Sequence, residues 1–226
     1  MSVATLKTDT QIRQDVLDEL NWDARMDSSE VGVQVDRGIV TLIGTVGSYA
    51  KKLAAKNAAH RVAGVLDVVN DLLVDLPDSL KRKDQDIARA IRQALEWDVL
   101  VPEDRLHSTV SQGWVILEGE VDTQSQREDA KTAVERLAGV RGVANQIVVK
   151  SRTRPSAERI RSSIVEALDR QVHREVNRIT IGVSGGVVTL SGAVRSWAEK
   201  NAVLNVVQFA PGVERLEDEL MIDSYH

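Results

Sequence analysis

The chain has 226 residues, of which 28% are charged, and its formal net charge at neutral pH is −5. The absence of cysteine excludes disulfide bonds and thiolate metal sites. The net charge is −3 for residues 1–76, −2 for 77–150 and 0 for 151–226, which excludes broad binding to nucleic acid or to an anionic bilayer by charge alone.

The N-terminal residues lack the basic and apolar regions of a secretory signal, and no stretch approaches the roughly 20 apolar residues that span a membrane. We therefore expect a cytoplasmic protein that is not transmembrane. The densest basic run is interpreted as a solvated linker rather than as a binding site. It consists of Arg152, Arg154, Arg159 and Arg161.

A glycine-bounded segment occurs three times along the chain, at offsets of 75 and 73 residues. The three copies are GIVTLIG at 38–44, GWVILEG at 113–119 and GVVTLSG at 186–192. The same offsets relate three Gly-Val pairs and three isoleucines, namely Gly64-Val65, Gly139-Val140 and Gly212-Val213, and Ile12, Ile87 and Ile160. Because separate landmarks share one register, we predict three tandem units. Their bounds are 8–76, 83–150 and 156–223.

Each unit is predicted to begin with a helix, because apolar residues recur at helical spacing. These residues are Ile12, Val16, Leu17 and Leu20, then Ile87, Ile91 and Leu95, and then Ile160, Ile164, Val165 and Leu168. The helix starts are indicated by Asp9 or Thr10, by Asp84 and by Pro155-Ser156.

A β-hairpin is expected next, with first strands near 31–35, 106–110 and 179–183. Its turns close on Gly38, Gly113 and Gly186, because glycine readily adopts the positive φ of hairpin turns. In the second strand a further glycine falls on the apolar face, which predicts close packing of a helix backbone or a bulge. These glycines are Gly44, Gly119 and Gly192.

A second helix is predicted over roughly 49–62, 124–137 and 197–209, and its alanines allow close approach to the sheet. Gly64, Gly139 and Gly212 are expected to be its C-caps. The last strands cover 68–74, 143–149 and 216–222. The order α-β-β-α-β predicts the α+β class, in which each unit is a small three-stranded mixed sheet covered by two helices.

This pattern resembles the BON domain. The resemblance lies in Gly-x-Val-x-Leu-x-Gly, the alanine-containing helix, the Gly-Val pair, and an Asn or Asp in the last strand, here Asn70, Asn145 and Asp218. It extends from about Thr8 to Asp223, and the second unit matches best. The resemblance implies the α-β-β-α-β fold, a transport-associated role in osmotic or envelope stress, and attachment to phospholipid. The family is often periplasmic and has no catalytic motif.

The inventory of reactive residues indicates no enzyme, no cofactor and no metal site. None of the histidines has a partner at metal-ligand spacing; they are His60, His107, His173 and His226. A Gly-x-Ser-x-Gly string spans 182–186, but a nucleophile elbow needs a strand-to-helix turn and this string falls in a hairpin. Glu118 and Glu120 are interpreted as a solvated face rather than as a cation site.

The tryptophans are the candidate surface contacts: Trp22, Trp97, Trp114 and Trp197. Trp22 and Trp97 are equivalent and end the first helix of their units, where the third unit has Arg170. One interpretation, which the sequence favours, is that these side chains cap small cores. The other is an exposed aromatic rim for lipid headgroups or a partner protein.

We therefore hypothesise a non-enzymatic binding protein of bacterial osmotic or envelope stress. It would contact phospholipid or envelope and client proteins, not nucleic acid, and the tandem copies would add avidity. One alternative is a cytoplasmic protein that responds to potassium or another monovalent cation. The other is a structural oligomerisation module.

Overall fold

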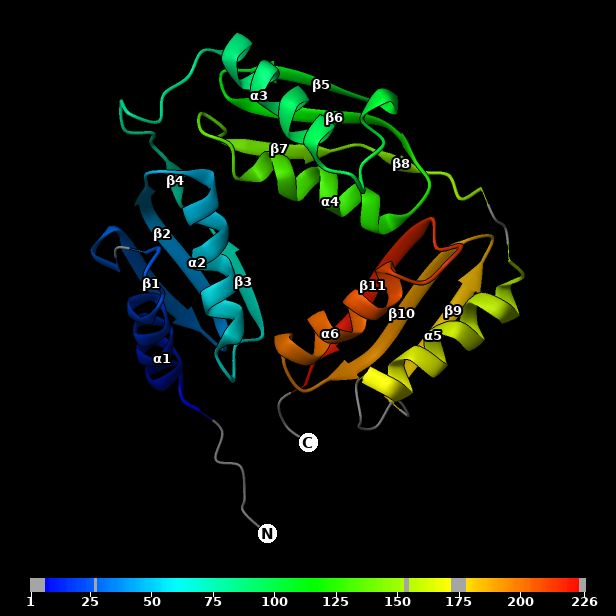
Figure 1. The fold of residues 1–226 in the computed structure, drawn as a ribbon. Coiled ribbons are helices and arrows are strands. Elements are labelled where there is room, and N and C mark those ends of the chain that lie inside the picture. The colour runs from blue at the N-terminus through cyan, green and yellow to red at the C-terminus, as the bar shows by residue number, and fades with distance from the viewer. Residues whose placement is uncertain (1–6, 27, 153–154, 172–177, 224–226) are drawn as a thin grey trace. The chain divides into compact units, whose positions relative to one another are not determined.

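The computed structural model describes residues 7–26, 28–152, 155–171 and 178–223 (Figure 1). Arg154, His173 and His226 lie outside the described residues. The first unit consists of α1 (Asp9–Trp22), η1 (Ser28–Glu30), β1 (Val31–Asp36), β2 (Ile39–Val46), α2 (Tyr49–Arg61), β3 (Asp67–Asn70) and β4 (Leu73–Val74). The second consists of α3 (Asp84–Trp97), η2 (Glu103–Arg105), β5 (Leu106–Ser111), β6 (Trp114–Val121), α4 (Gln124–Glu135), β7 (Gly142–Asn145) and β8 (Val148–Val149). The third consists of α5 (Ala157–Gln171), β9 (Ile179–Ser184), β10 (Val187–Val194), α6 (Trp197–Gln208) and β11 (Arg215–Ile222).

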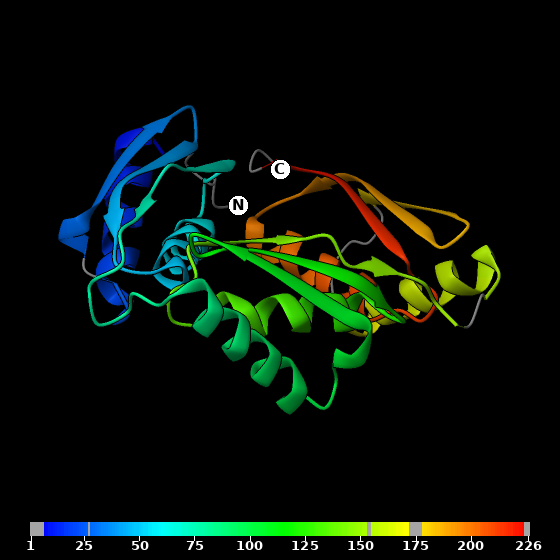
Figure 2. The ribbon, with the colours of Figure 1, turned by 90° about the horizontal axis from the view of Figure 1, so that it is seen from above.

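The sheets confirm the predicted α+β class. In the first unit β2 is central, antiparallel to β1 and parallel to β3 and β4. The second unit repeats this with β6 between β5 and β7, and the third has the order β11-β10-β9. In the second unit, helices α3 and α4 lie on the same face of the sheet (Figures 1 and 2).

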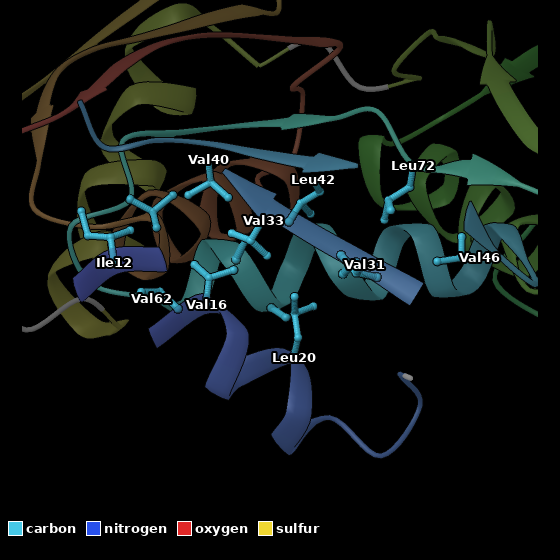
Figure 3. Close-up of a cluster of buried hydrophobic side chains, with 14 residues drawn as sticks. Ile12, Val16, Leu20, Val31, Val33, Val40, Leu42, Val46, Val62 and Leu72 are labelled. Carbon is cyan, nitrogen blue, oxygen red and sulfur yellow. The ribbon is translucent and has the colours of Figure 1, made fainter. Parts of the chain in front are cut away.

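The core of the first unit shows why this sequence folds in this way (Figure 3). Thr8 accepts a hydrogen bond from the backbone N–H of Gln11, and the Gln11 side chain accepts from the Thr8 backbone, so α1 begins with a capping box. The buried face of α1 then packs against the alternating buried residues of the hairpin. Burial of each such side chain stabilises the fold by roughly 1.5–3 kcal/mol. The side chains drawn include Ile12, Val16 and Leu20 from α1 and Val33, Val40 and Leu42 from the sheet.

The last strand, which the sequence predicts as one piece, is interrupted in the first two units. In the first, the Asn70 side-chain amide donates to the Lys52 carbonyl (2.9 Å), and its oxygen accepts from the Leu72 backbone N–H (3.3 Å). This arrangement ties the strand to α2 and turns Leu72 into the core, where it is only 1% exposed. Asn145 makes the equivalent two bonds in the second unit.

Asp218 replaces this asparagine in the third unit. Its carboxylate accepts from the Leu220 backbone N–H (3.0 Å), but a carboxylate has no N–H to donate to the helix. There β11 runs without interruption from Arg215 to Ile222.

The glycine in the middle of each second strand lies close to the backbone that precedes the adjacent strand. Gly44 has φ 128°, and a Cβ there would lie 2.2 Å from the carbonyl oxygen of Glu30, just before β1. Gly119 would meet the Arg105 carbonyl oxygen at the same distance, and Gly192 has the same kind of contact. The predicted bulge was wrong, because the pairing Val31–Gly44 is regular. The helix backbone that Gly44 and Gly119 approach is that of the short 3-10 helices η1 and η2, which lead into the adjacent strand, and not that of an α-helix.

The C-cap prediction for Gly64, Gly139 and Gly212 was also wrong. Helix α2 ends at Arg61 and is capped by Val62, so Gly64 lies beyond the cap. A Cβ on Gly64 would lie 3.1 Å from the Ile12 side chain, and the other two glycines approach the equivalent isoleucines of their units. These glycines make room for the first helix rather than end the second.

Candidate functional site

The tryptophans of the first two units are largely exposed. Trp22 ends α1 and is 84% exposed, Trp97 ends α3 and is 79% exposed, and Trp114 begins β6 and is 60% exposed. These fractions overturn the interpretation that the three side chains cap cores. Trp197 begins α6 and is half-buried.

Trp97 belongs to an exposed apolar loop in the second unit. Val99 and Leu100 follow it and are 95% and 63% exposed. We call Trp97, Val99 and Leu100 the apolar tip. Asp98 caps α3, and its carboxylate accepts from the Leu100 backbone N–H at 3.0 Å. Val101 donates its backbone N–H to the Asp98 carbonyl (3.0 Å) and is itself buried. The loop is thus anchored in the core on one side while three apolar side chains face outward.

The equivalent loop of the first unit is held by charges. Arg25 donates from Nε to Asp23 Oδ1 (2.8 Å), and its backbone N–H donates to the same oxygen (3.1 Å). Arg61 lies 3.6 Å from the other Asp23 oxygen and also binds Glu19 (2.6 Å). The Arg25 hydrogen bond outweighs the opposing effect of burial and lowers the pKa of Asp23 to about 2. Here Trp22 stands beside an ion-pair network rather than beside apolar neighbours.

Trp114 lies on the face of the second sheet opposite to Val115, which is buried. A Cβ on Gly142, the paired residue of β7, would fall 2.2 Å from the Trp114 ring. The indole therefore rests over a bare stretch of backbone, and its outer side is exposed. This position presents an aromatic surface but no pocket.

The structure also places the remaining residues that the sequence singled out. Ser184 ends β9 and enters a strand-to-strand turn, so the Gly-x-Ser-x-Gly string is not a nucleophile elbow. Glu120 pairs with Lys150 at the surface, as a solvated face requires. His60 lies on α2 and His107 on β5. In the described ranges no group of three or more acidic or histidine side chains is arranged to hold a metal ion.

Val99 and Leu100 are the candidate residues that sequence reasoning missed. The available signal was their position, since two apolar residues directly follow the Trp97-Asp98 helix end where the first unit has Ala24 and Arg25. No helix in the described part of the chain is long and apolar enough to cross a membrane.

The chain is similar to known proteins. A curated relative is osmotically-inducible protein Y of Escherichia coli (strain K12), 33% identical over 127 residues. That alignment covers 54% of this chain and 63% of the relative, so the chain spans less than two thirds of the relative's length. A solved structure of CdsD, a structural protein of the type III secretion system of Chlamydia trachomatis, is 12% identical. The match covers 93% of this chain and 91% of the CdsD chain, with a TM-score of 0.26.

The family comparison covers most of the chain. The BON domain model matches residues 8–75, 83–151 and 156–223, each of which contains one α-β-β-α-β unit. The chain therefore belongs to the BON domain family and carries the domain three times.

Proposed function

We propose that this protein is a non-enzymatic binding protein of osmotic or envelope stress, and that its apolar tip inserts into phospholipid membranes. The observation that carries the proposal is the exposure of Trp97, Val99 and Leu100 on one anchored loop. The link to osmotic stress is supported by the similarity to osmotically-inducible protein Y.

The chemistry of the tip fits the interface of a bilayer. Tryptophan is enriched at the level of the lipid headgroups, where its ring is buried and its N–H stays hydrated. Valine and leucine beside it add apolar surface that gains roughly 1.5–3 kcal/mol per side chain when fully removed from water. Such a contact is weak and reversible, as expected of attachment to a bilayer surface through a few apolar side chains.

Charge adds little to this attachment. Residues 77–150 carry a net charge of −2, so an anionic bilayer does not attract the second unit as a whole. Binding through the tip therefore depends on apolar contact and should change little with salt concentration, because screening acts on charges.

The test is flotation with liposomes of phosphatidylcholine and phosphatidylglycerol. The triple variant Trp97→Ala, Val99→Ser, Leu100→Ser should lose at least about 30-fold in partitioning, because three apolar side chains no longer leave water. All three positions are exposed, so the variant should keep the far-ultraviolet spectrum and unfolding midpoint of the wild type.

Trp22→Ala is the matched control, since Trp22 occupies the same helix position without apolar neighbours. It should float like the wild type. The proposal fails if the wild type does not float with any lipid mixture, or if the triple variant and the wild type float equally. If an immobilised envelope protein retains the chain and liposomes do not, the apolar tip is a protein-binding surface instead.

A further inference from the structure

A carboxylate closes the hairpin turn in each of the first two units. In the first, Asp9 at the start of α1 accepts from the backbone N–H groups of Arg37 (2.8 Å) and Gly38 (2.9 Å). In the second, Asp84 at the start of α3 accepts from Gln112 (2.8 Å) and Gly113 (3.0 Å). Each of the two carboxylate oxygens accepts from one amide, so the same bidentate arrangement occurs in both units.

The third unit keeps the turn but lacks the carboxylate. Ala157 stands at the position of Asp9 and Asp84. The turn amides are those of Gly185 and Gly186, and no acceptor among the described residues binds either of them. The turn conformation is unchanged, with φ of 54° and 84° against 52° and 80° in the second unit.

A cavity of about 240 Å³ occupies the vacated position. Its lining includes Pro155, Ala157, Gly185, Gly186 and Glu214. Nothing lies within 4 Å of a Cβ built on Gly185, whereas one on Gly186 would meet Glu214 and the Gly212 carbonyl oxygen at 3.2 Å, so the turn is open on its Gly185 side. The volume is below the roughly 300 Å³ at which pockets for drug-sized ligands begin, which favours a small group.

We propose that the third unit binds an external carboxylate here, on the two turn amides that an internal aspartate occupies in the other two units. The two bound aspartates show which chemistry these amides accept, since both adjacent N–H groups reach one planar carboxylate. The start of the 15-residue helix α5 adds a favourable partial positive charge.

The charges near the cavity are of both signs, Glu214 and Glu158 on one side and Arg159 on the other. Glu214 lines the cavity, its Oε1 accepts from the Ser151 backbone N–H at 3.1 Å, and its carboxyl carbon would lie 3.3 Å from a Cβ on Gly186. Arg159, in the first turn of α5, is exposed and replaces Gln11 and Asp86 of the other units. The first turn of α5 thus has Ala157, Glu158 and Arg159 where the second unit has Asp84, Gln85 and Asp86, so two carboxylates are replaced by one carboxylate and one guanidinium.

The test is amide NMR of the full chain titrated with acetate, with chloride and phosphate at matched ionic strength. Acetate should shift the Gly185 and Gly186 amide signals downfield in a saturable way, because both N–H groups gain an acceptor. Two further arms distinguish the sources of the carboxylate: N-acetyl-Gly-Gly with a free C-terminus, and its C-terminal amide. Saturation by the free acid and not by the amide shows that the carboxylate end of a chain is also accepted.

Two variants make the inference falsifiable. Ala157→Asp restores the internal carboxylate and should abolish the acetate response, while moving the free-state Gly185 and Gly186 signals to the acetate-bound positions. Asp84→Ala should create the same response at Gln112 and Gly113 of the second unit. If Asp84→Ala does not fold, Ala157→Asp decides, because an aspartate is favourable at the start of a helix.

The proposal is overturned if acetate leaves both glycine signals unmoved, if chloride and phosphate shift them equally, or if Ala157→Asp responds like the wild type. None of these outcomes bears on the apolar tip, which liposome flotation tests separately.

Discussion

The loop after the first helix is built from charged side chains in the first unit and from apolar ones in the second. Asp23 and Arg25 hold one loop by hydrogen bonds. In the other loop the side chains of Val99 and Leu100 are exposed. Both loops follow a tryptophan and an aspartate at the end of a helix. The difference teaches that one scaffold presents different surfaces according to two loop residues that the core does not use.

The third unit differs from both at another place, the hairpin turn. There Ala157 leaves two turn amides without the carboxylate that closes the other units. The copies therefore keep the same fold while their loops and turns carry different side chains.

The largest effect is expected from the scaffold that the first two units share. Gly44→Ala and Gly119→Ala should each lower the free energy of unfolding of their unit by about 3 kcal/mol or more, because the new Cβ collides with a carbonyl oxygen at positive φ. Urea unfolding followed by amide NMR signals of each unit measures both.

Gly182→Ala is the control for these two variants. A Cβ there meets its nearest atoms at 3.7 Å, so the change should stay within about 0.5 kcal/mol. Unequal losses at Gly44 and Gly119 would contradict an equivalent scaffold.

A smaller effect is expected when the loop of the first unit receives the residues of the second. The double variant Ala24→Val, Arg25→Leu should destabilise the first unit by about 1–2 kcal/mol, because the mostly buried Asp23 loses its main partner. It should also increase partitioning into liposomes, since Trp22 then has apolar neighbours. A graft that destabilises without any gain in flotation would show that the apolar tip needs more than its three side chains.

The smallest effect is the acid sensitivity of the charged loop. The pKa of Asp23 is about 2 in the folded chain and 3.8 ordinarily, so its ion pair stabilises the fold above pH 4 and this contribution disappears as the pH falls from about 4 to about 2. The contribution is about 1 kcal/mol, because Arg25 is 67% exposed and water screens the pair.

Carboxyl carbon NMR of Asp23 against pH measures this directly. In Arg25→Gln the titration should move up toward 3.8, because the first cause of the shift is the Arg25 hydrogen bond. An unchanged midpoint in that variant would assign the shift to Arg61 instead.

Much of the fold could be predicted from particular residues. The helical spacing of Ile12, Val16 and Leu20 predicted α1, and all three side chains are buried. The hairpin followed from strand alternation and from Gly38, which has φ 76°. These predictions succeed because burial periodicity and turn conformation are local properties, read within a few residues.

The candidate sites were less accessible. The favoured interpretation that the tryptophans cap small cores was wrong for Trp22, Trp97 and Trp114, and the alternative of exposed side chains holds for them. Whether a residue at the end of a helix or strand points inward depends on how that element packs. Val99 and Leu100 were missed because apolar residues are usually buried. Ala157 is informative only by comparison with Asp9 and Asp84, whose carboxylates accept hydrogen bonds from the turn amides of their units.

The sequence by itself determined the three units, their element order and the buried faces, because repetition and periodicity are written along the chain. The tertiary structure alone decided which backbone each glycine approaches, which apolar side chains stay in water, and where a missing carboxylate opens a cavity. These depend on contacts between residues 14 to 29 positions apart in the chain, such as Gly44 with Glu30 and Asp9 with Gly38, and no local pattern encodes such contacts.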